Sequence, residues 1–226
     1  MTISPPPALT PDPGDPCFPA RVRDLGTCAF GDSLTLQREL VAARQRDEIP
    51  DTLLLVEHPH VITLGRGTHK ENLLAPGDLP VFEIERGGDV TYHGPGQLVG
   101  YPIFLLRPAE RDLHRYLRNL EEALIRALAD LGLRAGRREG WTGVWTLADA
   151  PAKLASIGVA VKRWVTLHGF ALNVATDLAR FAAINPCGLD AAVMTSVSAE
   201  LGRPVAIGDV APLVVRHLGA IMNRAL

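Results

Sequence analysis

The stretch KLASIGVAVKRWVTLHGFALNV at residues 153–174 decides the fold, because it contains two apolar runs with almost nothing between them. Residues 153–161 and 164–174 are each long enough for a strand, and only Lys162-Arg163 separate them. Two such runs joined by a tight turn predict an antiparallel β-hairpin. Part of the sheet is therefore expected to consist of strands that are neighbours in sequence.

Other strands and helices are predicted on both sides of this hairpin. Short apolar runs predict strands at 21–30, 53–56, 61–64, 81–84, 98–105 and 141–145. Leucines spaced three and four apart predict a helix at about 110–131. Further helices are expected after a cap at Asp32 or Ser33, at about 176–183 and at about 207–223. This order of elements predicts an α+β fold, with a mixed or mainly antiparallel sheet and packed helices.

Composition narrows the class of protein. Of 226 residues, 47% are apolar and 21% are charged, which is ordinary for a globular protein. A net charge of −2 gives no general attraction to nucleic acid. No apolar run is long enough to cross a membrane and no secretion signal is visible, so a cytoplasmic protein is expected. Seven prolines in residues 1–20 predict a flexible extension, and residues 21–226 are expected to form a single domain and a monomer.

The cysteines and histidines give no sign of a metal site. Three cysteines, at positions 17, 28 and 187, are widely spaced and odd in number, which favours neither a disulfide framework nor structural zinc. His58 and His60 flank a proline without an evident third ligand, so they are expected to be ordinary hydrogen-bonded or exposed side chains. His168 is expected to be a packed strand residue.

Two residues carry the chemistry that the sequence suggests most strongly. Cys187 lies in a Pro-Cys-Gly turn, and a thiolate is the strongest common nucleophile near neutral pH. Alternatively, it is a small buried apolar residue. Lys153 begins the first apolar run of the hairpin, where its amine could stabilise the thiolate or accept the thiol proton. The alternative is a lysine that reaches out to solvent.

A glycine-rich segment, RGGDVTYHGPGQ at residues 86–97, supplies a third element. Gly87 and Gly88 would let a ligand approach the backbone closely. Tyr92 and His93 could point into a cavity, and Arg86 could meet a carboxylate or phosphate. The segment matches neither common nucleotide-binding loop, and it could also be a surface turn. A cysteine, a lysine and a glycine-lined pocket together favour acyl transfer through a thioester.

These motifs resemble the octanoyltransferases of lipoate biosynthesis, the lipoyl(octanoyl) transferase family. Glu57-His58-Pro59 with Thr63-Leu64-Gly65-Arg66 is similar to the family's early motif. Segment 86–97, Lys153 to Gly158, His168 to Asn173 and Pro186-Cys187-Gly188 match the remaining motifs in order. The resemblance covers about residues 21–225 and implies a fold related to the catalytic domains of biotin and lipoate protein ligases.

The resemblance also implies an activity and a set of site residues. The family moves an octanoyl group from the phosphopantetheine of acyl carrier protein to a lysine of lipoyl domains. Those domains belong to 2-oxoacid dehydrogenase complexes and the glycine cleavage H protein. By this resemblance Cys187 forms the thioester, Lys153 lowers its pKa or acts as acid and base, and no metal or cofactor takes part. The residues implied to line the acyl and substrate pocket are Arg86, Gly87, Gly88, Asp89, Val90, Thr91, Tyr92, His93, Ser156, Ile157, Gly158, Gly169, Phe170 and Ala171.

Three other functions remain open at this point. A biotin or lipoate ligase on the same fold would need ATP and no nucleophilic cysteine. A thiol hydrolase would use Cys187 with a histidine and release free octanoate. A non-catalytic acyl-binding module would bind without turnover.

Overall fold

The computed structural model describes residues 17–226, so most of the predicted extension at 1–20 lies outside the described residues. Strand β1 already begins at Phe18, which places the last residues of that predicted extension inside the sheet. The boundary predicted at residue 21 is therefore too late.

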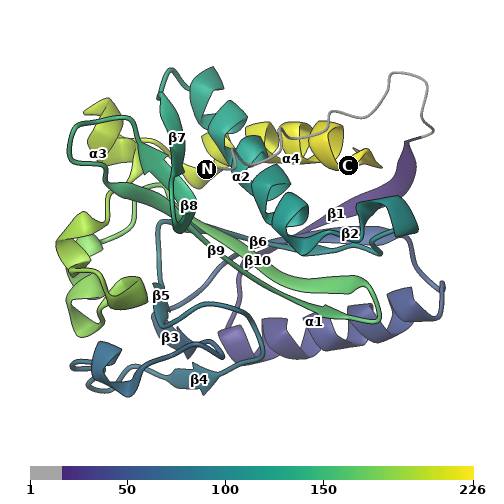
Figure 1. The fold of residues 1–226 in the computed structure, drawn as a ribbon, viewed down its shortest axis with the longest axis horizontal. Helices are drawn as coiled ribbons and strands as arrows, with labels where there is room; N and C mark the ends of the chain where they lie inside the picture. Colours follow the sequence, from purple (N-terminus) through teal and green to yellow (C-terminus); the bar gives the residue numbers. More distant parts are fainter. Residues whose placement is uncertain (1–16) are drawn as a thin grey trace, which may run out of the picture.

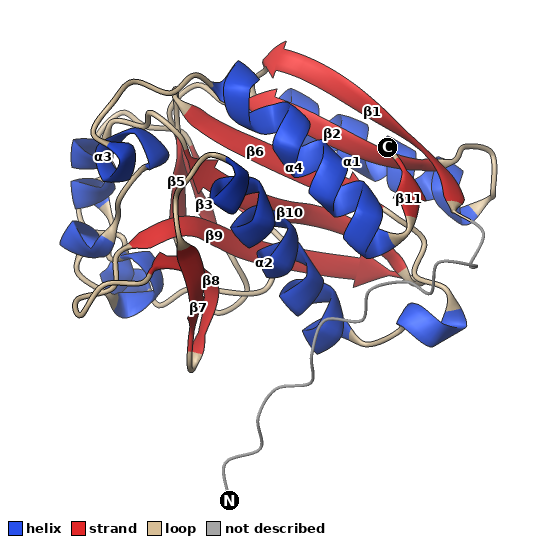
Figure 2. Ribbon diagram, turned by 90° about the horizontal axis from the view of Figure 1, so that it is seen from above, coloured by secondary structure: helices blue, strands red, loops and turns tan. Residues whose placement is uncertain are grey.

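The main sheet has the order β11-β1-β2-β6-β10-β9-β8-β7 (Figures 1 and 2). From β2 to β7 every neighbouring pair is antiparallel, whereas β1 runs parallel to both β2 and β11. The predicted mixed sheet is thus confirmed. Its strands are β1 Phe18–Thr27, β2 Asp51–Glu57, β6 Gln97–Ile103, β7 Ala135–Arg138, β8 Trp141–Thr146, β9 Lys153–Lys162, β10 Val165–Asn173 and β11 Arg224–Ala225.

The predicted hairpin is strands β9 and β10, but its turn lies one residue later than expected. Lys162 pairs with Val165, so the two-residue loop is Arg163-Trp164. Both loop residues have positive φ, 48° and 66°. A two-residue hairpin turn of type I′ requires that geometry at both positions, and glycine or asparagine usually supply it. Neither is present here, which is why the sequence predicted a turn but placed it one residue too early.

Helices cover both faces of the main sheet (Figure 2). Helices α2 (Leu113–Asp130) and α4 (Ile207–Met222) pack with Leu53 and Leu55 of β2 in one core cluster. Helix α1 (Phe30–Gln45) packs with Leu54 and Val56 in another. Successive side chains of a strand point to opposite faces, so β2 serves both cores. This explains its continuous apolar run.

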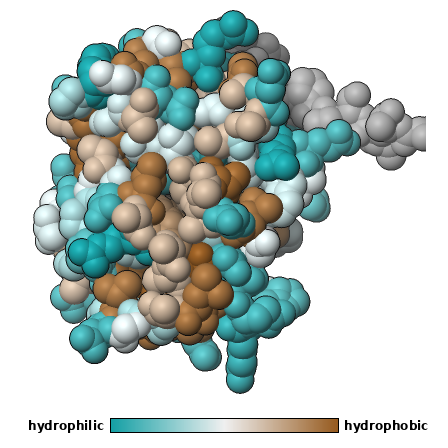
Figure 3. Space-filling model, turned by 90° about the vertical axis from the view of Figure 1, so that its left-hand side faces the viewer, coloured by the Kyte–Doolittle hydropathy of each residue, from teal (hydrophilic) through white to brown (hydrophobic). Residues whose placement is uncertain are grey.

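A second sheet has the order β4-β3-β5, with β3 at Val61–Leu64, β4 at Val81–Glu83 and β5 at Thr91–His93. Strand β5 lies inside the segment predicted as a loop, and it pairs antiparallel with β3. Short helical turns lie near this sheet: η1 Lys70–Asn72, η3 Leu178–Ala183, η4 Pro186–Gly188 and η5 Ala191–Val193, followed by helix α3 Val197–Leu201. The remaining turn, η2 Pro108–Glu110, lies elsewhere, beside β11. The face that carries them has apolar side chains in its middle and hydrophilic ones around them (Figure 3).

Three details differ from the predicted elements. Helix α1 begins at Phe30 and has Ala29 as its N-cap, so Asp32 and Ser33 lie inside its first turn, where the Ser33 hydroxyl donates to the Phe30 carbonyl. The helix predicted at 176–183 is the short 3₁₀ helix η3. Strands β7 and β11 and helix α3 are too short to give a pattern in the sequence.

A buried ion cluster fastens the carboxyl end of the chain to the sheet. Asp51 accepts from Arg44 Nε at 2.7 Å and from Arg224 Nε at 2.5 Å. Arg224 also binds Glu110 at 2.8 Å. Side chains of α1, β2, β11 and η2 thus share one network. Within residues 17–226, no helix has the length and apolar character needed to span a membrane.

Candidate active site

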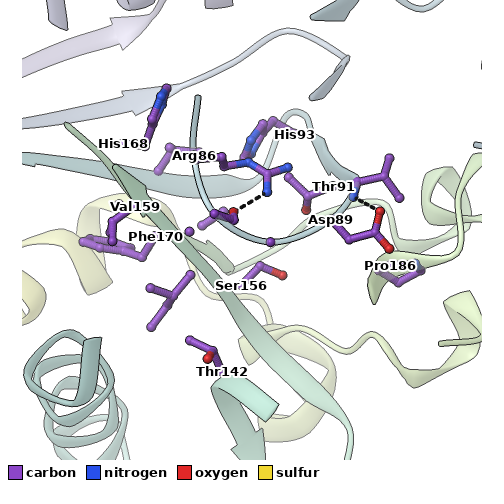
Figure 4. Close-up of a pocket in the computed structure, with 18 of the residues that line it drawn as sticks. Arg86, Asp89, Thr91, His93, Thr142, Ser156, Val159, His168, Phe170 and Pro186 are labelled. Carbon is purple, nitrogen blue, oxygen red and sulfur yellow. Dashed lines mark hydrogen bonds between the residues drawn. The ribbon is translucent and has the colours of Figure 1, made fainter. Parts of the chain in front are cut away.

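A cavity of about 320 Å³ lies over strands β9 and β10 and beneath the glycine-rich segment (Figure 4). That volume is at the lower end of the usual range for small-molecule sites. Every substrate-binding residue implied by the resemblance lines it except Tyr92, and Lys153 lines it as well. The cavity also has walls that the sequence did not indicate: Phe30, Ile84, Val99, Tyr101, Leu117, Gly140, Trp141, Thr142, Val159, His168 and Pro186.

The floor of the cavity is the central part of the β9–β10 hairpin. Gly158 pairs with Gly169, and Ile157 with Phe170. The glycine-rich segment lies directly on this floor, because Gly87 N donates to the Val159 carbonyl at 2.9 Å. A Cβ on Gly158 would lie only 2.9 Å from the Gly87 carbonyl oxygen. Glycine is therefore required where the two backbones meet.

Arg86 holds the glycine-rich segment in place. Its side chain is buried, and Nη2 donates to the Thr63 carbonyl at 2.9 Å and to the Thr63 hydroxyl at 3.1 Å. Nη1 donates to the carbonyl of Gly87 at 3.1 Å. These bonds tie the start of the segment to β3. The guanidinium thus shapes the cavity wall through protein contacts, and the expectation that it meets a carboxylate or phosphate stays a prediction.

Tyr92 is the one implied lining residue that lies elsewhere. Its ring is fully buried and packs edge-on against Phe181 at 5.1 Å, and its hydroxyl bonds His60 Nδ1 at 2.6 Å. The reason is strand alternation: Thr91 and His93 face the cavity, so Tyr92 between them faces the other way. The expectation that Tyr92 points into the cavity is wrong.

The histidines flanking Pro59 are satisfied side chains, as expected. His60 binds the Tyr92 hydroxyl, and His58 Nδ1 lies 2.6 Å from the Cys28 carbonyl. A carbonyl only accepts, so His58 Nδ1 carries the proton and Nε2 accepts from the Tyr101 hydroxyl at 2.8 Å. Among residues 17–226, no group of three His, Cys, Asp or Glu side chains could hold a metal ion.

One end of the cavity holds two uncharged imidazoles, His93 and His168, beside the Arg86 guanidinium. Burial lowers the pKa of His93 to about 3, with His58 adding to the effect. Burial likewise lowers the pKa of His168 to about 4, although Glu85 opposes it from 3.7 Å. The Nε2 atom of His168 is buried without a hydrogen-bond partner among the described residues. Both imidazoles are therefore uncharged near pH 7. His168 is packed in its strand as expected, but it also lines the cavity.

The other end holds Lys153 and the turn that contains Cys187. Lys153 is 2% exposed, and its Nζ lies 5.3 Å from the centre of the Trp145 ring. The Lys153 carbonyl accepts from Thr195 N at 3.0 Å, which joins β9 to the segment that follows the turn. Pro186 lines the same cavity, and the Cys187 backbone lies in η4. The side chain of Cys187 is outside what the structure describes, so its proximity to Lys153 stays a prediction.

Some cavity-lining residues were not predicted from the sequence, for two reasons. Phe30, Val99 and Leu117 are apolar residues whose patterns indicate only packing. Trp141 and Thr142 belong to a segment that showed no motif. His168 did carry a signal, because it opens the His-Gly-Phe-Ala-Leu-Asn motif that also contains predicted lining residues.

The chain is similar to known proteins over most of its length. Residues 30–219 match the family described as lipoyl protein ligase A/B catalytic domain. The chain is 54% identical over 205 residues to an octanoyltransferase of Geobacter metallireducens, covering 91% of this chain and 94% of that one. It is 50% identical over 206 residues to an octanoyltransferase of Mycobacterium tuberculosis, covering 91% and 88%.

Solved structures show the same fold at low identity. A lipoate-protein ligase A bound with ATP superposes with a TM-score of 0.71 at 17% identity, covering 91% of this chain and 86% of that one. A putative lipoate protein ligase from T. acidophilum with bound lipoic acid gives 0.68 at 17% identity, covering 84% and 82%. The predicted ligase-like α+β fold is confirmed. On sequence, the chain belongs to the octanoyltransferase family and is an enzyme of protein lipoylation.

Proposed function

We propose that this octanoyltransferase transfers the octanoyl group in two steps through a thioester on Cys187, with Lys153 as its acid-base partner. The observation that carries the proposal is one cavity lined both by buried Lys153 and by Pro186, the neighbour of Cys187. A nucleophile and a base must lie within reach of the same carbonyl carbon. No other described lysine lines this cavity.

In the first step the Cys187 thiolate attacks the carbonyl carbon of octanoyl-phosphopantetheine on acyl carrier protein. A bond forms from Sγ to carbon, the bond from carbon to the carrier's sulfur breaks, and the carrier leaves as a thiol with a proton from Lys153. In the second step a lysine amine of a lipoyl domain attacks the new thioester. An amide forms, Cys187 is released, and the proton from the amine returns to Lys153. Backbone N–H groups at Ser156 to Gly158 are the proposed oxyanion donors.

The acyl chain is proposed to lie along the floor formed by Ile157, Gly158 and Phe170. These residues line the cavity and offer apolar or backbone surface. Each methylene that leaves water contributes about 0.8 kcal/mol, so the depth of this slot can select the length of the chain. The proposed acceptors are lipoyl domains of 2-oxoacid dehydrogenase complexes and of the glycine cleavage H protein, in the cytoplasm.

The decisive experiment incubates the protein with octanoyl carrier protein and no ATP, then locates the adduct by mass spectrometry. We expect one hydroxylamine-labile octanoyl group on Cys187 and its transfer to a lipoyl-domain lysine. Cys187→Ala should abolish the adduct. Cys28→Ala is the matched control, because burial raises the pKa of the Cys28 thiol and its Sγ bonds the Ala29 carbonyl. A strict need for ATP, or release of free octanoate alone, would overturn the proposal.

The lysine is tested separately. Lys153→Met should slow single-turnover acylation by at least about 100-fold, in the range of a lost acid-base group. Lys162→Met is the matched control at the opposite end of β9, where the side chain is exposed and 3.4 Å from Glu85. Equal acylation rates for the two variants would remove Lys153 from the scheme.

A further inference from the structure

Three segments that are distant in sequence meet beside the reactive end of the cavity. They are the glycine-rich segment, the turn η1 and the turn η4. Asn72, the last residue of η1, contacts both of the others. Its Nδ2 donates to Asp89 Oδ2 at 2.5 Å, and its carbonyl accepts from Asn185 N at 2.8 Å. Asn72 therefore bridges the cavity wall and the chain that leads into Cys187.

Asp89 is a buried carboxylate whose described partners are all N–H donors. Besides Asn72, it accepts from Val90 N at 2.7 Å and from His69 N at 3.3 Å. Among residues 17–226 it makes no salt bridge. A buried charge needs such donors to offset its lost hydration. The Asn72 amide is thus one of a small set of groups that hold this carboxylate in position.

The chain before Cys187 is fastened to the same turn by its backbone. Leu73 forms an antiparallel bridge with Ile184, and Leu74 N donates to the Ala183 carbonyl at 3.0 Å. A Cβ on Gly188 would lie 3.9 Å from Asn72 Nδ2. The turn 186–188 therefore rests against the Asn72 side chain. Asp89 and Pro186 both line the cavity, so the contact lies at its edge (Figure 4).

We infer that the Asn72–Asp89 pair is a positioning device, which sets the Cys187 turn against the cavity wall for attack on the thioester. This inference rests on the proposed function. Neither residue needs to touch the acyl group, because each acts through the backbone it fixes. Attack needs the sulfur close to the carbonyl carbon and well aligned, and a displacement of about 1 Å can cost about 100-fold in rate. The Asp89 carboxylate binds the backbone at His69 and Val90, and the Asn72 side chain that holds it belongs to the residue whose carbonyl binds Asn185 N, so the pair can supply that accuracy.

Exchanging the two side chains tests the pair directly. Asn72→Asp alone sets two carboxylates against each other, and Asp89→Asn alone removes the charge that the backbone donors bind. The double variant N72D/D89N restores one amide and one carboxylate. The oxygen of the amide introduced at position 89 can accept from Val90 N, and the nitrogen of that amide can donate to the carboxylate introduced at position 72. We expect acylation of Cys187 to fall about 100-fold in N72D and to recover to within about threefold in the double variant.

The assay is single-turnover formation of octanoyl-Cys187 by mass spectrometry, with thermal unfolding of each variant. Asp78→Asn, an exposed carboxylate in the same connection, is the matched control and should keep the wild-type rate. Asn72→Ala serves if N72D does not fold: we expect it to lower kcat about tenfold and leave the KM for the carrier unchanged. A lower melting temperature with an unchanged kcat would overturn the inference, as would a double variant no faster than N72D. Absence of acylation in the wild type would instead refute the proposed function.

Discussion

Replacing His168 by asparagine should make the free energy of unfolding less dependent on pH below about pH 6.5. Burial is the main reason that the pKa of His168 falls to about 4 from an ordinary 6.5. Because the folded-state pKa lies below the unfolded one, the unfolded chain takes up the proton first as the pH drops. This part of the stability is complete above about pH 6.5 and is lost as the pH falls from 6.5 toward 4.

The size of the effect follows from the shift. A shift of one pKa unit corresponds to about 1.4 kcal/mol. The titration of His168 should therefore lower the free energy of unfolding of the wild type by about 2 kcal/mol between pH 7.5 and pH 4.5. Asparagine cannot titrate, and it tolerates the positive φ of 58° that His168 adopts. Glu85, whose pKa is lowered to about 2, loses its contribution only below its ordinary 4.5, so the two effects are separable.

Urea unfolding at pH 7.5, 6 and 4.5 measures this difference for the wild type and the H168N variant. His69→Asn is the matched control, because that side chain is 72% exposed and water solvates it in both states. We expect the H168N free energy of unfolding to fall less on acidification than that of the wild type and of H69N. Parallel pH dependences for all three proteins would refute the assignment of His168 as a buried neutral imidazole.

Other changes test the packing, the ion pairs and the acyl slot. Gly169→Ala would place a Cβ 2.2 Å from the Gly100 carbonyl oxygen and should lower the free energy of unfolding by about 3 kcal/mol. Gly208→Ala is the control, because a Cβ there meets nothing within 4 Å. Equal urea midpoints for the two variants would contradict this prediction. Arg224→Met removes a cation from buried Asp51 and should lower the free energy of unfolding by about 3 kcal/mol; an unchanged unfolding curve would count against the cluster. Each methylene removed from the octanoyl donor should lower kcat/KM about fourfold, and a flat dependence on chain length would exclude an apolar slot.

Strong periodicity made much of the fold predictable from the sequence. The leucine spacing placed helix α2 within a few residues, and paired apolar runs gave the β9–β10 hairpin. The failures are elements whose formation depends on distant partners. Strand β5 has three residues in a segment rich in glycine and proline, and only pairing with β3 makes it a strand. Local sequence carries no signal for such a strand.

The site was predictable where glycine and motif residues form it, and not where ordinary core residues do. Gly87, Gly158 and Gly169 line the cavity as expected, because close backbone approach needs glycine. Phe30 and Val99 look identical in sequence to residues that only pack. Tyr92 is the reverse case, a residue expected in the cavity that lies outside it. Its place inside a motif suggests a lining residue, but strand alternation buries its side chain on the other face of β5.

A chain of buried hydrogen bonds explains why residues far apart in the sequence form one site. Asn173 Nδ2 donates to the Thr195 carbonyl at 3.0 Å, so its Oδ1 must face Gln97 and accept from Nε2 at 2.9 Å. That fixes Gln97 Oε1 toward His93 Nδ1 at 2.8 Å, and a carbonyl oxygen there requires the proton on Nδ1. Thr195 N in turn donates to the Lys153 carbonyl at 3.0 Å. One backbone carbonyl thus sets the orientation of both amides and the tautomer of His93, and the same segment binds the strand of Lys153. Through Gln97, therefore, the end of the cavity that holds His93 and the end that holds Lys153 share a single buried hydrogen-bond network.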